Sequence, residues 1–128
     1  MEVFVGRHDR TLDAKGRVVL PARWRGSFQH CFLAPHEDGC IALWTAEEFA
    51  KEAERQHLRE SEGAPARHDV RDWFARATDV DLDAQGRMQL PPDLRAHARI
   101  DGDVLFVGVH DRVELWSRQR WESRRDPE

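Results

Sequence analysis

Leu12-Asp13-Ala14-Lys15-Gly16-Arg17-Val18-Val19-Leu20-Pro21 is a stretch that this chain of 128 residues contains in two versions. The second version, seventy positions later, is Leu82-Asp83-Ala84-Gln85-Gly86-Arg87-Met88-Gln89-Leu90-Pro91. Residues 12–25 and 82–95 are identical at eight of fourteen positions, where unrelated sequences would share about one. The chain therefore contains an internal repeat.

Each copy has the residues of a tight turn. Asp13 and Asp83 are of the type favoured at the first position of a type I turn. Gly16 and Gly86, three positions later, can adopt the positive φ that suits the fourth position. Because a short apolar run precedes each turn, we interpret each copy as a β-hairpin with Asp-X-X-Gly at its tip.

A short strand and a short helix are expected after each turn. The strands are predicted at 17–20 and 87–90, and a proline ends each of them because proline has no N–H to donate to a strand ladder. Proline also suits the first turn of a helix, so short helices are predicted at 22–25 and 92–98.

Periodicity and helix caps predict the remaining elements. Runs rich in β-branched and aromatic residues predict a strand or arm at 3–5 and strands at 31–34, 40–44, 78–82, 104–109 and 113–116. Thr45, with a glutamate three positions later, has capping-box spacing and predicts a helix from 46 to about 59. Apolar residues at i, i+3, i+4 and i+7 predict a second helix at 67–77. Ser117 is expected to cap a last helix that contains Trp121.

The two copies divide the chain into halves. We expect a first half-domain at 1–60, a connecting loop and helix at 61–76, and a second half-domain at 77–128. Each half is too small to bury a core alone, and an isolated hairpin is marginal in water. The hairpins of one half are therefore expected to pair with those of the other, in an α+β, mainly β molecule with a pseudo-twofold axis.

The composition indicates a globular protein, with 40% hydrophobic residues. No run approaches the roughly twenty apolar residues of a membrane span, and no signal peptide precedes the first copy, so no membrane association is expected. Cys31 and Cys40 are the two cysteines, in a chain without secretory features. A reduced, cytoplasmic setting fits this usage.

Charge is distributed unevenly along the chain, although the net charge is only −4. Residues 1–30 contain six arginines and lysines against three acidic residues, while residues 76–99 contain four of each. The first copy is therefore the basic one, which favours it for contact with nucleic-acid phosphates.

Several basic residues are candidates for DNA contact. They are Arg7, Arg10, Lys15, Arg17 and Arg87. Of these, Arg7 and Arg10 are second-tier candidates, together with Arg23 and Arg25. Lys15 and Arg17 lie at a hairpin tip and on the strand that leaves it, where long cationic side chains can reach phosphates. An arginine there can also contact guanine in the major groove, which a two-stranded ribbon fits.

A purely structural role is the alternative for the two hairpin arginines. Arg17 can pair with Asp13, and Arg87 with Asp83, within the turn that each pair flanks. Three aspartates at 79, 81 and 83 make the surroundings of Arg87 acidic and its approach to a phosphate unfavourable. The structural role is therefore more strongly favoured in the second copy.

No metal site or catalytic centre is predicted. His30, Cys31, His36 and Cys40 do not match the spacing of a common zinc pattern, and a cysteine in an apolar strand behaves as a small hydrophobe. We find no pairing of a nucleophile with a base of the kind that an active site needs. We therefore expect no metal, no cofactor and no enzymatic activity.

The repeated Asp-X-X-X-Arg signature, at 13–17 and 83–87, resembles that of the MraZ family of bacterial transcriptional regulators. In both copies Leu-Pro and a short helix follow the signature. The resemblance covers nearly the whole chain, including Trp73-Phe74 before the second copy and Val107-Gly108 and Glu114-Leu115-Trp116 after it. Lys15 of the first copy is replaced by Gln85 in the second.

The resemblance implies both a fold and a function. The fold is a tandem pair of SpoVT-AbrB-like half-domains, a swapped-hairpin β-barrel of AbrB/MazE type with flanking helices. The function is that of a cytoplasmic, nucleoid-associated protein that binds promoter DNA as a ring of many subunits. The DNA consists of closely spaced direct repeats, and the promoter typically controls the cell-division and cell-wall gene cluster.

A protein-binding module is the alternative function. Antitoxin-like proteins of the same swapped-hairpin type use their surface to bind another protein. Such antitoxins usually carry one hairpin unit and a disordered tail, whereas this chain has two units, which favours the regulator. A further protein partner stays open under either interpretation.

Overall fold

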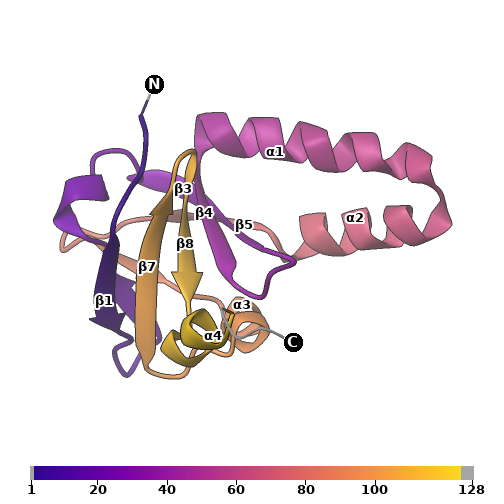
Figure 1. Cartoon of the computed structure of the whole chain (residues 1–128). Helices are drawn as coiled ribbons and strands as arrows, with labels where there is room; N and C mark the ends of the chain where they lie inside the picture. Colours follow the sequence, from indigo (N-terminus) through magenta and orange to yellow (C-terminus); the bar gives the residue numbers. More distant parts are fainter. Residues whose placement is uncertain (1, 125–128) are drawn as a thin grey trace.

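The computed structural model describes residues 2–124, and Figure 1 shows a body of strands from which two helices project together. The strands are β1 (Arg7–Thr11), β2 (Arg17–Val19), β3 (His30–Pro35), β4 (Ile41–Thr45), β5 (Thr78–Asp81), β6 (Arg87–Gln89), β7 (Asp103–Val109) and β8 (Arg112–Trp116). The helices are α1 (Ala46–Leu58), α2 (Ala64–Arg76), α3 (Pro92–Ala98) and α4 (Arg118–Ser123), with 3-10 turns η1 (Ala22–Trp24) and η2 (Arg59–Glu62). The predicted α+β, mainly β class is confirmed.

The strands form two sheets with one symmetry. The larger sheet has the order β1-β7-β8-β4-β3-β5, the smaller one is β2-β6, and every pair is antiparallel. Exchanging each strand with its counterpart in the other half reproduces both orders, so the topology has the predicted pseudo-twofold symmetry. Within residues 2–124 no ladder joins β1 to β5 into a closed barrel.

The two strands beside each turn do not pair with each other, which corrects the hairpin expected for an isolated copy. Instead, β1 pairs with β7, β5 with β3, and β2 with β6, each across the two halves. Two further backbone hydrogen bonds join the halves. Leu20 N–H donates to the Gly86 carbonyl at 2.9 Å, and Leu90 N–H donates to the Gly16 carbonyl at 3.0 Å. The predicted pairing between halves is thereby confirmed.

One hydrophobic core lies between the two sheets and is shared by both halves. The small sheet contributes Val18 and Met88, each 1% exposed, with Leu20 and Leu90 just beyond its strands. The larger sheet contributes Leu33, Leu43, Phe106, Val113 and Leu115, all of them fully buried. Burying a side chain of this size stabilises the fold by about 1.5–3 kcal/mol, so neither half keeps its core without the other.

The two projecting helices begin and end close to the predicted positions. Thr45 caps α1, because its hydroxyl accepts a bond from the Glu48 N–H at 3.2 Å. The second helix, α2, begins at Ala64, three residues before the predicted start, since Gly63 reverses the chain at φ 121° and Pro65 suits a first helical turn. Val70 is the buried residue of α2, and α1 has none. Most of the α1–α2 pair therefore lies away from the core.

The other predicted caps and strands are also observed with small shifts. Ser117 caps α4 by accepting from the Arg120 N–H at 3.0 Å, as predicted. The strand expected at 3–5 is reduced to a single bridge between Phe4 and His110, and the chain instead forms β1 from the charged residues that follow. The predicted short helix at 22–25 is a 3-10 turn.

The N-terminal arm crosses β7 at a glycine. Gly108 donates its N–H to the Gly6 carbonyl at 2.8 Å, and Phe4 exchanges two backbone bonds with His110 at 2.8 and 2.9 Å. Phe4 is 3% exposed, and its ring centroid lies 4.9 Å from that of Phe28. A Cβ on Gly108 would overlap backbone atoms of Phe4 and Val5, so the arm can lie here only over a glycine.

We predict that Gly108→Ala lowers the free energy of unfolding by about 1–3 kcal/mol, because the added methyl displaces the arm and loosens Phe4. Urea denaturation followed by tryptophan fluorescence measures the change. Gly26→Ala is the matched control, since a Cβ there meets nothing within 4 Å, and it should shift stability by less than about 0.5 kcal/mol. Equal midpoints for the two variants would contradict the close approach of the arm.

Candidate nucleic-acid interface

The first turn is organised by the Asp13 carboxylate. Its Oδ1 accepts from the backbone N–H groups of Lys15 and Arg17, both at 2.9 Å, and its Oδ2 accepts from Arg17 Nε at 2.8 Å. The backbone closes the same loop, because Asp13 N–H donates to the Arg17 carbonyl at 2.8 Å and Gly16 N–H to the Asp13 carbonyl at 3.0 Å. Gly16 has φ 77°, as the predicted turn requires.

The second turn repeats this arrangement around Asp83. Oδ1 accepts from the N–H groups of Gln85 and Arg87 at 2.9 Å, and Oδ2 from Arg87 Nε at 2.7 Å. Gly86 has φ 78°. The predicted structural role of Asp13, Gly16, Asp83 and Gly86 therefore has the expected geometry, and the ion pairs Arg17–Asp13 and Arg87–Asp83 are both formed.

These hydrogen bonds act on the titration of both aspartates. The pKa of Asp13 is lowered, chiefly by the backbone N–H of Arg17, and further by the Arg17 side chain and the Lys15 N–H. The pKa of Asp83 is lowered in the same way by Arg87 and Gln85. Each carboxylate therefore stays ionised at neutral pH and holds its arginine in one orientation.

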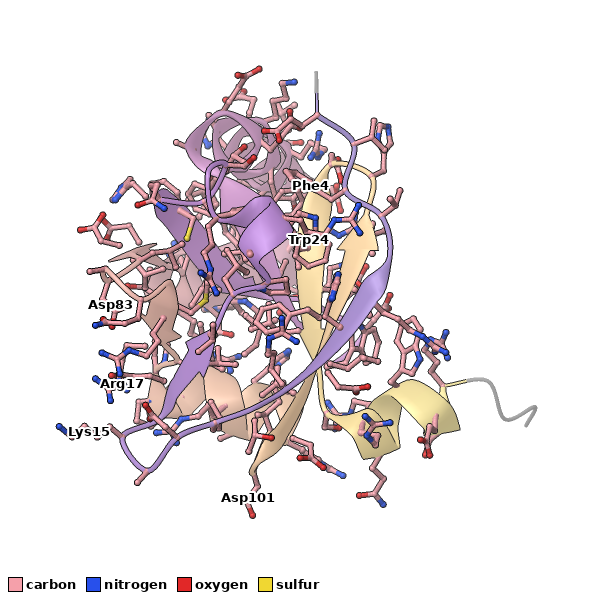
Figure 2. All side chains as sticks on the ribbon, turned by 90° about the vertical axis from the view of Figure 1, so that its left-hand side faces the viewer. Phe4, Lys15, Arg17, Trp24, Asp83 and Asp101 are labelled. Atoms are coloured by element: carbon pink, nitrogen blue, oxygen red, sulfur yellow. The ribbon has the colours of Figure 1, made fainter. Side chains whose placement is uncertain are left out.

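The two turns lie at opposite ends of the short antiparallel β2–β6 ladder, because each turn directly precedes its strand. Arg17 is opposite Gln89, and Arg87 is opposite Val19. Figure 2 shows Lys15, Arg17 and Asp83 along one side of the molecule. The sequence alone placed these residues seventy positions apart, and pairing between halves joins them into one candidate surface, which we call the turn face (Lys15, Arg17, Gln85, Arg87).

Two further arginines support the turn face from the opposite half. Arg25 donates from Nε to the Leu20 carbonyl at 2.9 Å and lies against Gly86. Its counterpart Arg95 lies against Gly16, where a Cβ would come within 3.2 Å of the guanidinium carbon. Both turn glycines thus leave room for an arginine of the other half. Arg95 was missed from the sequence, although its identity with Arg25 in the repeat was a usable signal.

The two turns differ in how firmly their arginine is held. Arg17 and Arg87 have similar side-chain exposure, 28% and 30%. Arg87 also donates from a terminal nitrogen to Gln85 Oε1 at 3.2 Å. Among residues 2–124 the terminal nitrogens of Arg17 have no such partner, and the residue equivalent to Gln85 is the exposed cation Lys15. The first turn therefore presents more positive charge and more donors.

A glutamine of the second half donates a hydrogen bond to the backbone of the first turn. Gln89 Nε2 donates to the Lys15 carbonyl at 2.8 Å, while the counterpart of Gln89 in the first half is Val19, which has no such group. The Lys15 backbone is consequently fixed although its ammonium group is exposed. Gln89 carries no local signal in the sequence, because its partner is distant in the chain.

The other predicted cations lie on the edge strand rather than on a turn. Arg7 and Arg10 belong to β1, at the edge of the larger sheet. Arg10 donates to the Asp9 carbonyl at 2.8 Å, and burial, Arg10 and Arg23 lower the pKa of His8. Arg7 and Arg10 are therefore not members of the turn face. A contact of either residue with DNA would be made by β1 and not by the turns.

The cysteines and histidines form no metal site in the described part of the chain. Burial raises the pKa of Cys31 to about 12, with a contribution from Asp81, and burial also raises the pKa of Cys40. Both thiols are fully buried and stay protonated at neutral pH, so they lack the thiolate that binds metals.

In residues 2–124 no helix is long and apolar enough to cross a membrane.

We predict that replacing both turn aspartates, Asp13→Asn and Asp83→Asn, lowers stability at neutral pH and flattens its dependence on acid. The folded pKa values are depressed, so the stabilisation is present above the unfolded value of about 3.9 and is lost as pH falls through the folded values. Urea denaturation at neutral pH and at several values between about pH 2 and 5 measures it. An Asp101→Asn control, at an exposed bend, should keep the wild-type slope; a double variant that also keeps it would contradict the ionised turns.

Comparison with known proteins identifies the relatives of this chain. A family described as "MraZ protein, putative antitoxin-like" matches residues 73–125. The Transcriptional regulator MraZ of Lachnoclostridium phytofermentans is 38% identical over 123 residues, which are 94% of this chain and 86% of that protein. The protein of the same name from Moorella thermoacetica is 40% identical over 94% of this chain and 85% of its own length. With this identity along almost its full length, the chain belongs to the MraZ family.

Proposed function

We propose that this chain is a sequence-specific, DNA-binding transcriptional regulator and that the first turn carries its main DNA contact. The observation that supports this most is the asymmetry of the turn face. Lys15 is an exposed cation beside Arg17, whose Nε is held by Asp13 and whose terminal nitrogens have no partner among residues 2–124. The relatives named above carry the name of a transcriptional regulator, a role that is not enzymatic.

The geometry of the turn face suits the major groove. A two-stranded ribbon can enter that groove, which is about 12 Å wide, and β2–β6 with its turns is such a ribbon. Arg17 then contacts a guanine or a phosphate with its terminal nitrogens, because Asp13 occupies only Nε. Orientation by a carboxylate reduces the conformational entropy that the arginine loses on binding.

The second turn is proposed to have a smaller share in DNA binding. Gln85 carries no charge and accepts a bond from Arg87 at 3.2 Å, so that arginine has fewer free donors. Asp79 and Asp81 lie on β5, which leads into this turn, and repel phosphates. Arg87 is therefore mainly a structural residue that supports the face.

Assembly is proposed to provide the affinity that one turn lacks. A single basic turn offers few phosphate contacts, and each contact is weakened by salt. A homo-oligomeric ring that engages closely spaced direct repeats makes the later contacts intramolecular, which raises avidity by a factor of about 10² to 10⁴. By resemblance to the family, the target is the promoter of the cell-division and cell-wall gene cluster, and the protein is cytoplasmic and nucleoid-associated.

We predict opposite effects for a reciprocal exchange between the turns. Lys15→Gln should weaken binding to the DNA upstream of the gene, and lower the slope of log K against log salt by about 0.9 for each phosphate that is no longer neutralised. Gln85→Lys should strengthen binding, because it adds a cation and releases the terminal nitrogen of Arg87. Fluorescence anisotropy at several salt concentrations measures both variants on the upstream fragment and on unrelated DNA.

The control is Lys51→Gln, which removes an equal charge from α1, where Lys51 pairs with Glu48 at 3.0 Å. Its affinity and salt slope should match the wild type. If the upstream fragment is not preferred at any salt and Lys15→Gln binds as the wild type does, the regulator proposal fails. The antitoxin-like, protein-binding function is then favoured instead.

We also predict that affinity depends on assembly. At protein concentrations where sedimentation shows a single subunit, binding to the upstream fragment should be weaker by a factor of about 10² or more than for the assembled protein. Shortening the fragment to a single repeat should remove most of this advantage. A single subunit that binds as tightly as the assembly would refute the proposed avidity.

A further inference from the structure

Lysine is rare in this chain. Of its twenty lysines and arginines, Lys15 and Lys51 are the two lysines. An arginine keeps its charge and does not act as an amine nucleophile, whereas lysine is a target of acylation, which removes its charge. The chain therefore offers two side-chain amines for this modification, and their surroundings differ.

The Lys15 amine lies at an exposed turn beside another cation. Its side chain has no hydrogen-bond or ion-pair partner among residues 2–124, while its backbone is held by Asp13 and Gln89. The terminal nitrogens of Arg17 likewise have no partner in this part of the chain. Figure 2 shows Lys15 and Arg17 close to each other on one side of the molecule. The amine is thus free to react, and a guanidinium group lies beside it.

A second guanidinium group reaches this turn from the other half. Arg95 lies against Gly16, where a Cβ would come within 3.2 Å of Arg95 Nη1. Its guanidinium has no hydrogen-bond or ion-pair partner among residues 2–124, and its Nε is also buried. Asp13 offsets the charge of Arg17, but in the described chain no carboxylate offsets that of Arg95. An anion that approaches Lys15 is therefore attracted by the turn.

Lys51 is also accessible, but it lies among carboxylates. Its side chain is 50% exposed, and its ammonium group pairs with Glu48 at 3.0 Å. Glu2 and Glu47 line the same small pocket as this ion pair. These carboxylates repel an anion. Exposure therefore does not separate the two lysines, whereas the charge around them does.

We propose that Lys15 is acylated by acyl phosphates, whose phosphate group is attracted by Arg17 and Arg95. The Lys15 ammonium group first releases a proton to water, and the free amine attacks the acyl carbon. The new C–N bond forms as the bond from that carbon to the phosphate oxygen breaks. Inorganic phosphate leaves with the bonding electrons, and water takes up the second proton of the amine.

The second copy shows what such a modification does to the turn. Acyl-lysine and glutamine both carry a neutral amide, and Gln85 occupies the position of Lys15. Its Oε1 accepts from a terminal nitrogen of Arg87 at 3.2 Å. Acylation of Lys15 removes the charge that distinguishes the first turn, and so weakens its contact with DNA. This consequence rests on the proposed function, whereas the acylation itself does not.

The test compares two acetyl donors on the full chain. Acetyl phosphate is an anion and N-acetoxysuccinimide is neutral, and peptide mass spectrometry at low conversion gives the ratio of acetylated Lys15 to acetylated Lys51 for each donor. The ratio should be about tenfold higher with acetyl phosphate, because the turn concentrates the anionic donor. Added salt should reduce this difference. Equal ratios with the two donors would overturn the proposal.

Arg95→Gln removes the guanidinium without changing Lys15, and it should lower the acetyl phosphate ratio toward that of the neutral donor. Arg67→Gln is the matched control, since it removes an equal charge from an exposed position of α2 and should leave both ratios unchanged. A folded Arg95→Gln variant that keeps the wild-type ratio would refute the attraction of the donor by Arg95. If that variant does not fold, the two donors on the wild type decide the proposal.

A second measurement separates the modification from DNA binding. Lys51→Arg retains Lys15 as its one lysine, and Lys15→Arg keeps the charge without an amine that acylates. After treatment with acetyl phosphate, Lys51→Arg should bind the upstream fragment as weakly as Lys15→Gln, while Lys15→Arg should keep its affinity. Equal losses in both treated variants would contradict the effect of Lys15. If the untreated protein does not prefer the upstream fragment, the proposed function fails, and the ratio of acetylated lysines decides the acylation site by itself.

Discussion

The exchange of strand partners between the two halves is the constraint on which the rest of the structure depends. A strand as short as β2 or β6 has three residues and cannot bury its apolar side chains in a hairpin of its own copy. Pairing β2 with β6 places Val18 and Met88 at opposite positions of one ladder, over a core to which both halves contribute. Neither half can therefore fold without the other, and we expect the whole domain to unfold in a single cooperative transition.

The same exchange creates the candidate functional surface. Leu20 and Leu90 bond to the carbonyls of Gly86 and Gly16, so each strand ends against the turn of the other half. Arg25 and Arg95 then lie over those glycines, which ties the position of each turn to a residue beyond the opposite strand. The turns are held from both sides, and the proposed DNA-binding geometry needs no separate scaffold.

Much of this fold follows from the sequence, because local chemistry determines it. The Asp-X-X-Gly turns, the cap at Thr45 and the cap at Ser117 depend on neighbours within a few residues, and each formed as predicted. The repeat also implied pairing between halves. Which strand pairs with which is determined by long-range contacts, however, and the turn residues alone favour pairing within one hairpin, which is not observed. The β1 strand was missed because its residues, Arg-His-Asp-Arg-Thr, alternate charge rather than apolar side chains, and its ladder with β7 stabilises it instead.

The candidate sites were less predictable, since both depend on where the two halves differ. Residues that the fold requires are the same in each copy: the turn aspartates and glycines, the arginines after the prolines, and the tryptophans near the ends of β4 and β8. Among the pairs at which the copies differ, three alter a polar contact: Lys15 against Gln85, Val19 against Gln89, and Ala42 against Glu114. Because the backbone of the two halves is symmetric, these side-chain differences change polar contacts without changing the fold.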